Sequence, residues 1–145
     1  MAKTKGKLVT GYAHMWPREV FDMKENGKLL KEPKEQLKSP GVYVLYRNDQ
    51  PHYIGKTGRA LWDRIYDHAK KPKDKLYHLW NYFSAFEVLK SADRDEIEAI
   101  LIASMPTVNS ANPKILPISI PTKVTRALAK RNEINIERPK LATGK

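Results

Sequence analysis

The chain has 145 residues, of which 41% are hydrophobic and 30% charged, so it can bury the core of one domain and is not a wholly disordered protein. The lack of cysteine excludes disulfide frameworks and thiolate metal sites, and it favours a cytoplasmic protein. The sequence shows neither an apolar run long enough to span a membrane nor a secretory signal, so we expect no membrane partner. The net charge of +11 and the pI near 9.8 favour a polyanionic partner, most simply nucleic acid.

The first forty residues show no sustained periodicity. Residues 1–12 predict a loose start to the chain. Scattered apolar residues follow over residues 16–37, where Asn26-Gly27 and Pro33 interrupt them. This part of the chain therefore predicts one or two short helices or a loop.

A hairpin and a helix are predicted next. Residues 42–46 and 52–54 are β-rich runs separated by five polar, turn-forming residues, so we expect the two strands to pair. Residues 58–70 predict a helix, because apolar residues recur at four-residue spacing on one face of it. These residues are Leu61, Ile65 and Ala69.

The remaining pattern predicts three further elements and a basic end. Residues 74–82 predict a second helix, residues 84–89 a third strand, and residues 93–105 an amphipathic helix with acidic residues in its first turn. Residues 122–131 predict a basic helix. The order β-β-α-α-β-α indicates an α/β fold, a small three-stranded, mainly antiparallel sheet flanked by helices in a sandwich.

The positive charge lies mainly in the flanks of the chain. Residues 1–40 carry nine basic and five acidic side chains, residues 41–112 carry ten and nine, and residues 113–145 carry eight and two. Such basic extensions either lie along a phosphate backbone and release its counterions, or only keep the protein soluble. Charge alone does not decide between the two interpretations.

Two tyrosines stand on the predicted hairpin, near residues suited to a phosphate site. Tyr43 and Tyr53 lie on neighbouring strands, and Gly55 and Lys56 follow Tyr53 closely. A glycine lets a backbone or ligand approach, and a lysine supplies positive charge. The alternative is that both tyrosines are strand aromatics packed across the hairpin.

Three further side chains have the chemistry that phosphodiester hydrolysis needs, which is a base and a cation or metal. Arg64 and His68 are four residues apart, so they share one helix face, offset from the apolar stripe, where they would border a cleft. Glu98 lies on the last predicted helix of the domain. The alternatives are a solvated helix face for the first two and a surface carboxylate for Glu98.

The two tyrosine motifs resemble the paired signature of the GIY-YIG endonucleases. Gly41-Val42-Tyr43 is followed by Tyr53-Ile54-Gly55, with the two tyrosines ten residues apart. Lys56 follows the second motif, as in the nuclease domain of the bacterial nucleotide-excision-repair incision subunit. Val42 replaces the isoleucine of the family's first motif, which is a conservative change.

The resemblance continues along the chain in the family's order. Leu61-x-x-Arg64-x-x-x-His68 is similar to the family's arginine helix. Glu98-x-x-Leu101-Ile102, then Pro106 and Asn109, is similar to its metal-glutamate helix and the asparagine after it; Asn112 is the second candidate for that asparagine. The resemblance covers about half of the chain. It implies a nuclease domain at 40–112 between a basic N-terminal extension at 1–39 and a basic C-terminal extension at 113–145.

The resemblance implies a metal-dependent endonuclease that hydrolyses DNA. Glu98 would hold one divalent cation, Mg²⁺ or Mn²⁺, with water and phosphate completing its shell. Tyr43 would be the general base for water, and Arg64 would neutralise charge on the scissile phosphate. Tyr53 would orient groups or contact the phosphate, and Asn109 would stabilise the site by hydrogen bonds. Lys56 and His68 would supply positive charge that lets Tyr43 act as a base near neutral pH, and His68 would also relay a proton or bind the phosphate.

The chain shows no zinc-finger or helix-turn-helix pattern, so DNA contacts are expected from other residues. They are Gly55 in the domain and Lys123, Arg126, Lys130 and Arg131 in the C-terminal extension. The oligomeric state stays open, a dimer on DNA being one arrangement. Two alternatives remain: a non-catalytic nucleic-acid-binding protein on the same fold, and an interaction protein whose basic arms meet RNA.

Overall fold

The structure, a computed structural model, describes residues 7–109, 113 and 115–134. The chain divides into two compact units, Met1–Ile115 and Leu116–Lys145. The strands that the structure describes and the helices α1 to α3 belong to the first unit. The described part of the second unit contains one helix, α4 (Thr122–Ile134).

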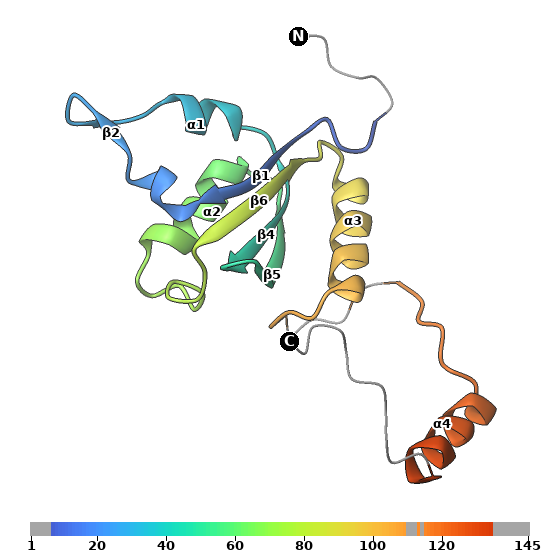
Figure 1. Ribbon diagram of the computed structural model, residues 1–145. Coiled ribbons are helices and arrows are strands. Elements are labelled where there is room, and N and C mark those ends of the chain that lie inside the picture. The colour runs from blue at the N-terminus through green and yellow to red at the C-terminus, as the bar shows by residue number, and fades with distance from the viewer. Residues whose placement is uncertain (1–6, 110–112, 114, 135–145) are drawn as a thin grey trace. The chain divides into compact units, whose positions relative to one another are not determined.

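The first unit is built on a four-stranded antiparallel sheet in the order β1-β6-β4-β5 (Figure 1). The strands are β1 (Gly11–Pro17), β4 (Gly41–Arg47), β5 (Gln50–Thr57) and β6 (Tyr82–Glu87). β4 and β5 form the predicted hairpin, and β6 is the predicted third strand. A separate small hairpin joins β2 (Lys24–Glu25) to β3 (Lys28–Leu29). The α/β class and the antiparallel sheet are therefore confirmed.

The prediction of three strands is wrong, because the N-terminal region supplies the edge strand β1. Alternation in β1 is broken: Tyr12 is exposed and Ala13 buried, but the pairing register with β6 shifts between Ala13 and Trp16. Met15, inside this irregularity, has a φ of 49°, in the left-handed region. The bulge removes the period of two on which a strand prediction depends.

The helices of the first unit are α1 (Glu32–Gln36), α2 (Leu61–Lys70) and α3 (Ser91–Ser104), with one 3₁₀ turn, η1 (Arg18–Phe21). α2 and α3 were both predicted from their apolar spacing. The buried stripe on α2 is confirmed, since all three of its members are less than 5% exposed. They are Leu61, Ile65 and Ala69.

The predicted helix over residues 74–82 is wrong, because this segment forms successive turns that lead into β6. Its backbone closes tight turns, in which the Tyr77 N–H donates to the Asp74 carbonyl and the Leu79 N–H to the Leu76 carbonyl, each three residues back. The Arg18 guanidinium donates to the carbonyls of Tyr77 and Trp80. A contact from a distant part of the chain thus takes the Tyr77 carbonyl, which a helix over 74–82 would use for its own hydrogen bond.

The sheet has an apolar core on each face. Val42 and Val44 of β4 pack under α3, whereas Tyr43 and Leu45 point to the opposite face, where α2 lies. Figure 1 shows α2 and α3 on opposite sides of the sheet. Phe21 is buried in the same cluster as Tyr43, so the region before residue 40 shares this core. The candidate site residues on α2 and α3 therefore approach from two faces, and β5 is the edge strand between them.

Candidate functional site

Tyr43 and His68 form a buried pair on the α2 face of the sheet. The Tyr43 hydroxyl lies 2.9 Å from Nε2 of His68, and the two side chains are 1% and 2% exposed. The Tyr53 ring lies beside both, with its centroid 6.4 Å from that of Tyr43 and 5.9 Å from that of His68. The prediction that His68 borders a cleft is wrong, because the ring turns inward to reach Tyr43.

Gly55 makes room for the Tyr43 ring. The two residues are paired across β4 and β5. A Cβ atom on Gly55 would lie 2.4 Å from both Cζ and the hydroxyl oxygen of Tyr43, closer than real Cβ contacts. The residue that the sequence marked for DNA contact is therefore the one that lets the tyrosine lie across the edge strand.

Burial controls protonation in this pair. It raises the pKa of the Tyr43 hydroxyl well above its ordinary value, and the positive charge and hydrogen bond of Arg64 oppose the rise only in part. Burial also lowers the pKa of His68, against the opposing effect of Asp74. At neutral pH the proton therefore stays on Tyr43, and His68 is a neutral imidazole.

Arg64 is the cation shared by the two tyrosines. Burial raises the pKa of Tyr53 as it does that of Tyr43, and Arg64 lowers both through its charge. Glu98 acts in the opposite sense, because its negative charge raises the pKa of Tyr53. The pKa of Tyr53 is thus affected by a charge on α2 and by a charge on α3. This electrostatic effect connects the residues on the two sides of the edge strand.

Lys56 lies on the α3 side, between two carboxylates. Its Nζ atom is 2.6 Å from Oδ1 of Asp95 and 3.5 Å from Oε1 of Glu98, residues one helical turn apart. The hydrogen bond to Asp95 is the largest cause that raises the pKa of Lys56. Lys56 was predicted to act beside Tyr43 or the phosphate, and its contacts in this structure are with Asp95 and Glu98.

Asn109 holds the outer edge of β5. Its Oδ1 atom accepts the Ile54 N–H at 2.9 Å, and its Nδ2 atom donates to the Ile54 carbonyl at 2.7 Å. Val108 N–H donates to the carbonyl of His52 at 2.9 Å. Asn109 therefore fixes the backbone between Tyr53 and Gly55. The alternative residue, Asn112, lies outside the described residues.

Asp74 is the member of this group that sequence reasoning missed. Both of its carboxylate oxygens lie 3.0 Å from Nδ1 of His68, on the side of the ring away from Tyr43. Asp74 is the first residue of the predicted helix over 74–82, which does not form. No local pattern marks its contact with His68, since the loop after α2 brings the two together.

Glu98 is the carboxylate that would hold a divalent cation, with water and phosphate completing the shell. Within residues 7–109, 113 and 115–134 no three His, Asp or Glu side chains gather as a metal-binding group. Mg²⁺ nevertheless needs only one or two carboxylates when a phosphate shares its shell. Glu98 is 21% exposed, so water can reach it, and a cation bound there would share the carboxylate with the ammonium of Lys56, 3.5 Å from Oε1.

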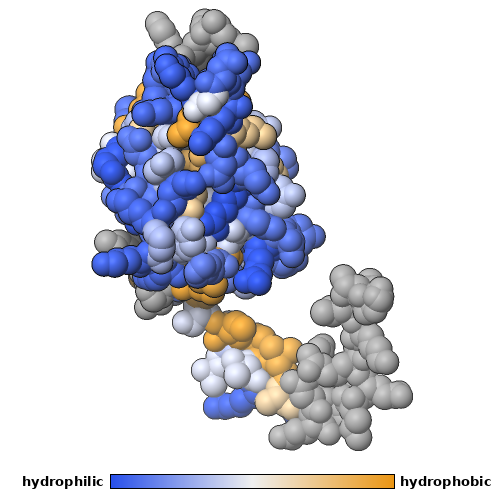
Figure 2. Space-filling view, turned by 90° about the vertical axis from the view of Figure 1, so that its left-hand side faces the viewer, coloured by the Kyte–Doolittle hydropathy of each residue, from blue (hydrophilic) through white to orange (hydrophobic). Residues whose placement is uncertain are grey.

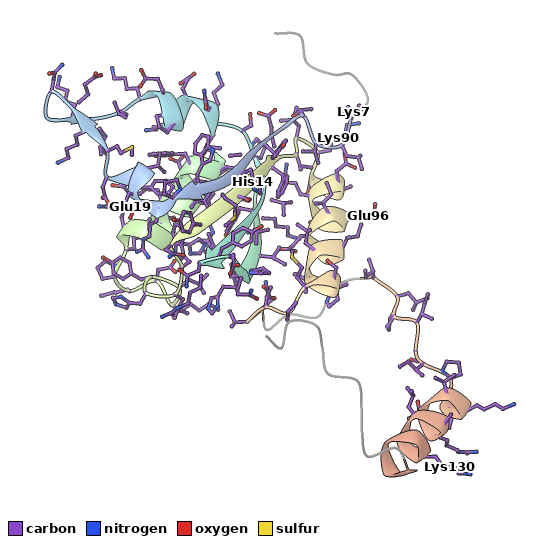
Figure 3. The ribbon with its side chains drawn as sticks, in the orientation of Figure 1. Lys7, His14, Glu19, Lys90, Glu96 and Lys130 are labelled. Atoms are coloured by element: carbon purple, nitrogen blue, oxygen red, sulfur yellow. The ribbon has the colours of Figure 1, made fainter. Side chains whose placement is uncertain are left out.

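The predicted DNA-binding residues of the second unit lie on α4. Lys123, Arg126 and Lys130 are exposed, and Figure 3 shows Lys130 extending from the helix. The side chain of Arg131 lies outside the described part of the chain. The same unit exposes apolar residues, among them Leu116 and Ile118. Figure 2 shows hydrophobic, orange surface between its hydrophilic residues. For the part of the chain that the structure covers, no helix has the length and apolar character needed to cross a membrane.

Comparisons with models of protein families, with curated proteins and with solved structures find no match to this chain. The likeness to GIY-YIG endonucleases therefore depends on the motif residues themselves and on their order in the sequence.

Proposed function

We propose that the protein is a metal-dependent endonuclease of the GIY-YIG type that hydrolyses DNA phosphodiester bonds. One observation carries the proposal: five side chains from four elements act on one another around the edge strand β5. These are Tyr43, Tyr53, Arg64, His68 and Glu98. A base, a phosphate-binding cation and a carboxylate for a metal are the parts that this hydrolysis needs.

In the proposed reaction Arg64 binds the scissile phosphate, because its planar fork matches two phosphate oxygens and its charge is permanent. Tyr53, beside Arg64 and under the influence of Glu98, orients the phosphate. Glu98 holds the divalent cation, which when bound supplies Lewis-acid stabilisation to the leaving oxygen.

The proton of the attacking water goes to the Tyr43 oxygen as Tyr43 passes its own proton to Nε2 of His68. The 2.9 Å distance between the two atoms suits this transfer. Because burial keeps Tyr43 protonated in the free protein, the concerted movement avoids a free tyrosinate. Hydroxide then attacks phosphorus, and the bond to the leaving oxygen breaks.

The proposal is tested by incubating supercoiled plasmid with the full chain, with magnesium or with a chelator. Nicked or linear DNA that forms only with magnesium is the expected result. A parallel incubation with a structured RNA separates DNA from RNA cleavage. DNA binding without any cleavage would contradict the proposal.

The second candidate function is a non-catalytic nucleic-acid-binding protein, which DNA binding without cleavage would support. The deep burial of Tyr43, at 1% exposure, favours this candidate, since a general base must reach water. Tyr53 and Arg64, which both act on Tyr43, are only partly buried, so under the nuclease proposal the attacking water would approach the Tyr43 hydroxyl from their side.

Removing residues 121–145 is expected to weaken DNA binding and to flatten its dependence on salt. The slope of log K against log salt becomes shallower by about 0.9 for each phosphate that the protein no longer neutralises, and by roughly 3 for three such phosphates. The first unit should stay folded, because α4 belongs to the other compact unit. Fluorescence anisotropy with a labelled duplex at several salt concentrations measures the slope.

A charge variant is the matched control for this truncation. Replacing Lys123, Arg126 and Lys130 with glutamine leaves the chain length unchanged and removes three exposed cations. It should reproduce most of the change in slope. An unchanged slope in both proteins would show that the C-terminal extension binds no phosphates.

A further inference from the structure

The environment of His68 is set by a carboxylate that the proposed reaction does not use directly. Both oxygens of Asp74 lie 3.0 Å from Nδ1 of His68, and the Asp74 side chain is only 15% exposed. Oδ1 of Asp74 also accepts the Leu76 N–H at 2.9 Å, which holds the carboxylate at a fixed angle. Burial alone would raise the pKa of Asp74, but its hydrogen bonds with His68 and with the Leu76 N–H outweigh burial and lower that pKa, so the carboxylate is ionised at neutral pH.

This contact determines which ring nitrogen of His68 carries the hydrogen. An ionised carboxylate only accepts hydrogen bonds, so Nδ1 must be the donor. In a neutral imidazole the other nitrogen, Nε2, is then a free acceptor, and it faces the Tyr43 hydroxyl at 2.9 Å. The other charged or titratable groups acting near the ring are Arg64 and Asp67 of α2 and Tyr53 of β5.

The loop that carries Asp74 is held by hydrogen bonds from Arg18, which lies outside that loop. Nη1 of Arg18 donates to the carbonyl of Tyr77 at 2.6 Å and to that of Trp80 at 3.1 Å, while Nη2 donates to the carbonyl of Ala69 at 2.8 Å. One guanidinium thus joins the end of α2, which bears His68, to the loop that bears Asp74. The geometry between the two side chains is held by this bridge as well as by their own hydrogen bond.

We propose that Asp74 is a positioning residue that fixes His68 in the tautomer with hydrogen on Nδ1, so that Nε2 receives the Tyr43 proton. The proposal rests on the proposed function for its catalytic part. When Tyr43 takes a proton from water and gives its own to Nε2, His68 becomes an imidazolium with both nitrogens protonated. The Asp74 carboxylate stabilises that charge and stays unprotonated.

The test is an NMR spectrum of the full chain with ¹⁵N-labelled histidine at pH 8. The long-range couplings between the ring nitrogens and the ring carbon-bound hydrogens distinguish a protonated from an unprotonated nitrogen. We expect His68 of the wild type to carry hydrogen on Nδ1 alone. The Asp74→Asn variant should lose this preference, because an amide can also donate to Nδ1 and so stabilise the other tautomer. The Asp74→Glu variant, which keeps a carboxylate, should restore it at least in part.

Asp67→Asn is the matched control, since Asp67 acts on His68 by charge alone and makes its ion pairs with Arg59 and Lys71. It should leave the tautomer unchanged. In the plasmid assay Asp74→Asn should cut about 10–100-fold more slowly at unchanged DNA affinity, the effect typical of a residue that orients a functional histidine.

Hydrogen on Nε2 in the wild type would overturn the proposal even if Asp74→Asn fails to fold. An unchanged tautomer in folded Asp74→Asn, or cutting by that variant at the wild-type rate, would also overturn it. If the wild type cuts no DNA while the tautomers behave as expected, the proposed function fails, and the assignment of Asp74 as the residue that orients His68 stands.

Discussion

The Arg64→Ala variant is expected to nick plasmid DNA about 10²–10³-fold more slowly than the wild type, the cost of removing one group that stabilises charge in a transition state. Arg64 has two effects in the site. It would contact the scissile phosphate, and its charge opposes the rise in the pKa of Tyr43 that burial causes. Without it the tyrosine gives up its proton less readily, so both binding and proton transfer suffer.

Two further arginine variants sharpen this test. Arg64→Lys keeps the positive charge and loses the planar fork, so its rate should fall between those of the wild type and Arg64→Ala. Arg59→Ala is the control, because Arg59 is 60% exposed and pairs with Asp67 away from the tyrosines. Nicking rates are measured under single turnover. A wild-type rate for Arg64→Ala would remove Arg64 from the proposed mechanism.

The Gly41→Ala variant is expected to lower the free energy of unfolding by about 3 kcal/mol, the upper end for overpacking in a core. A Cβ atom on Gly41 would lie 1.9 Å from the carbonyl oxygen of Phe86 and 3.0 Å from Cδ1 of Leu61. The first of these atoms belongs to the backbone of the neighbouring strand β6, which cannot rotate away. The strands β4 and β6 at the centre of the sheet must therefore separate locally.

Gly11→Ala is a close control for this stability prediction. Gly11 pairs with the same residue, Glu87 of β6, from the other side, and its added Cβ would meet nothing nearer than 3.9 Å. We expect a change within about 0.5 kcal/mol, as for a substitution without a clash. Urea denaturation followed by circular dichroism measures both. Equal stabilities for the two variants would contradict the close packing of β4 on β6.

The elements that the sequence predicts correctly are those whose pattern is local. The hairpin of β4 and β5, strand β6 and the helices α2 and α3 each combine apolar spacing with turn or capping residues. Strand β1 escapes prediction because the irregularity at Met15 breaks its alternation. The turns after α2 escape it because Arg18, more than fifty residues earlier, binds their carbonyls.

The site shows the same division. Tyr43, Tyr53, Arg64 and Glu98 were selected from the resemblance of local motifs, which need only residue types and spacing along the chain. The sequence did not predict how deeply Tyr43 and His68 are buried. This burial depends on Gly55, which leaves space for the Tyr43 ring on the neighbouring strand. The partners Asp74 and Asp95 were missed, since loops and helix faces, rather than spacing along the chain, bring them to His68 and Lys56.

The most direct test of the nuclease proposal compares two glutamates of α3 in magnesium-dependent plasmid nicking. Glu98→Gln keeps the shape of the side chain and removes the charge that would hold the cation. Glu96→Gln makes the same change at an exposed residue whose side chain points away from the sheet (Figure 3).

We expect the wild type and Glu96→Gln to nick DNA with magnesium and not with chelator, and Glu98→Gln to be at least about 10²-fold slower at unchanged DNA affinity. Nicking by Glu98→Gln at the wild-type rate would contradict a metal-dependent site built on Glu98.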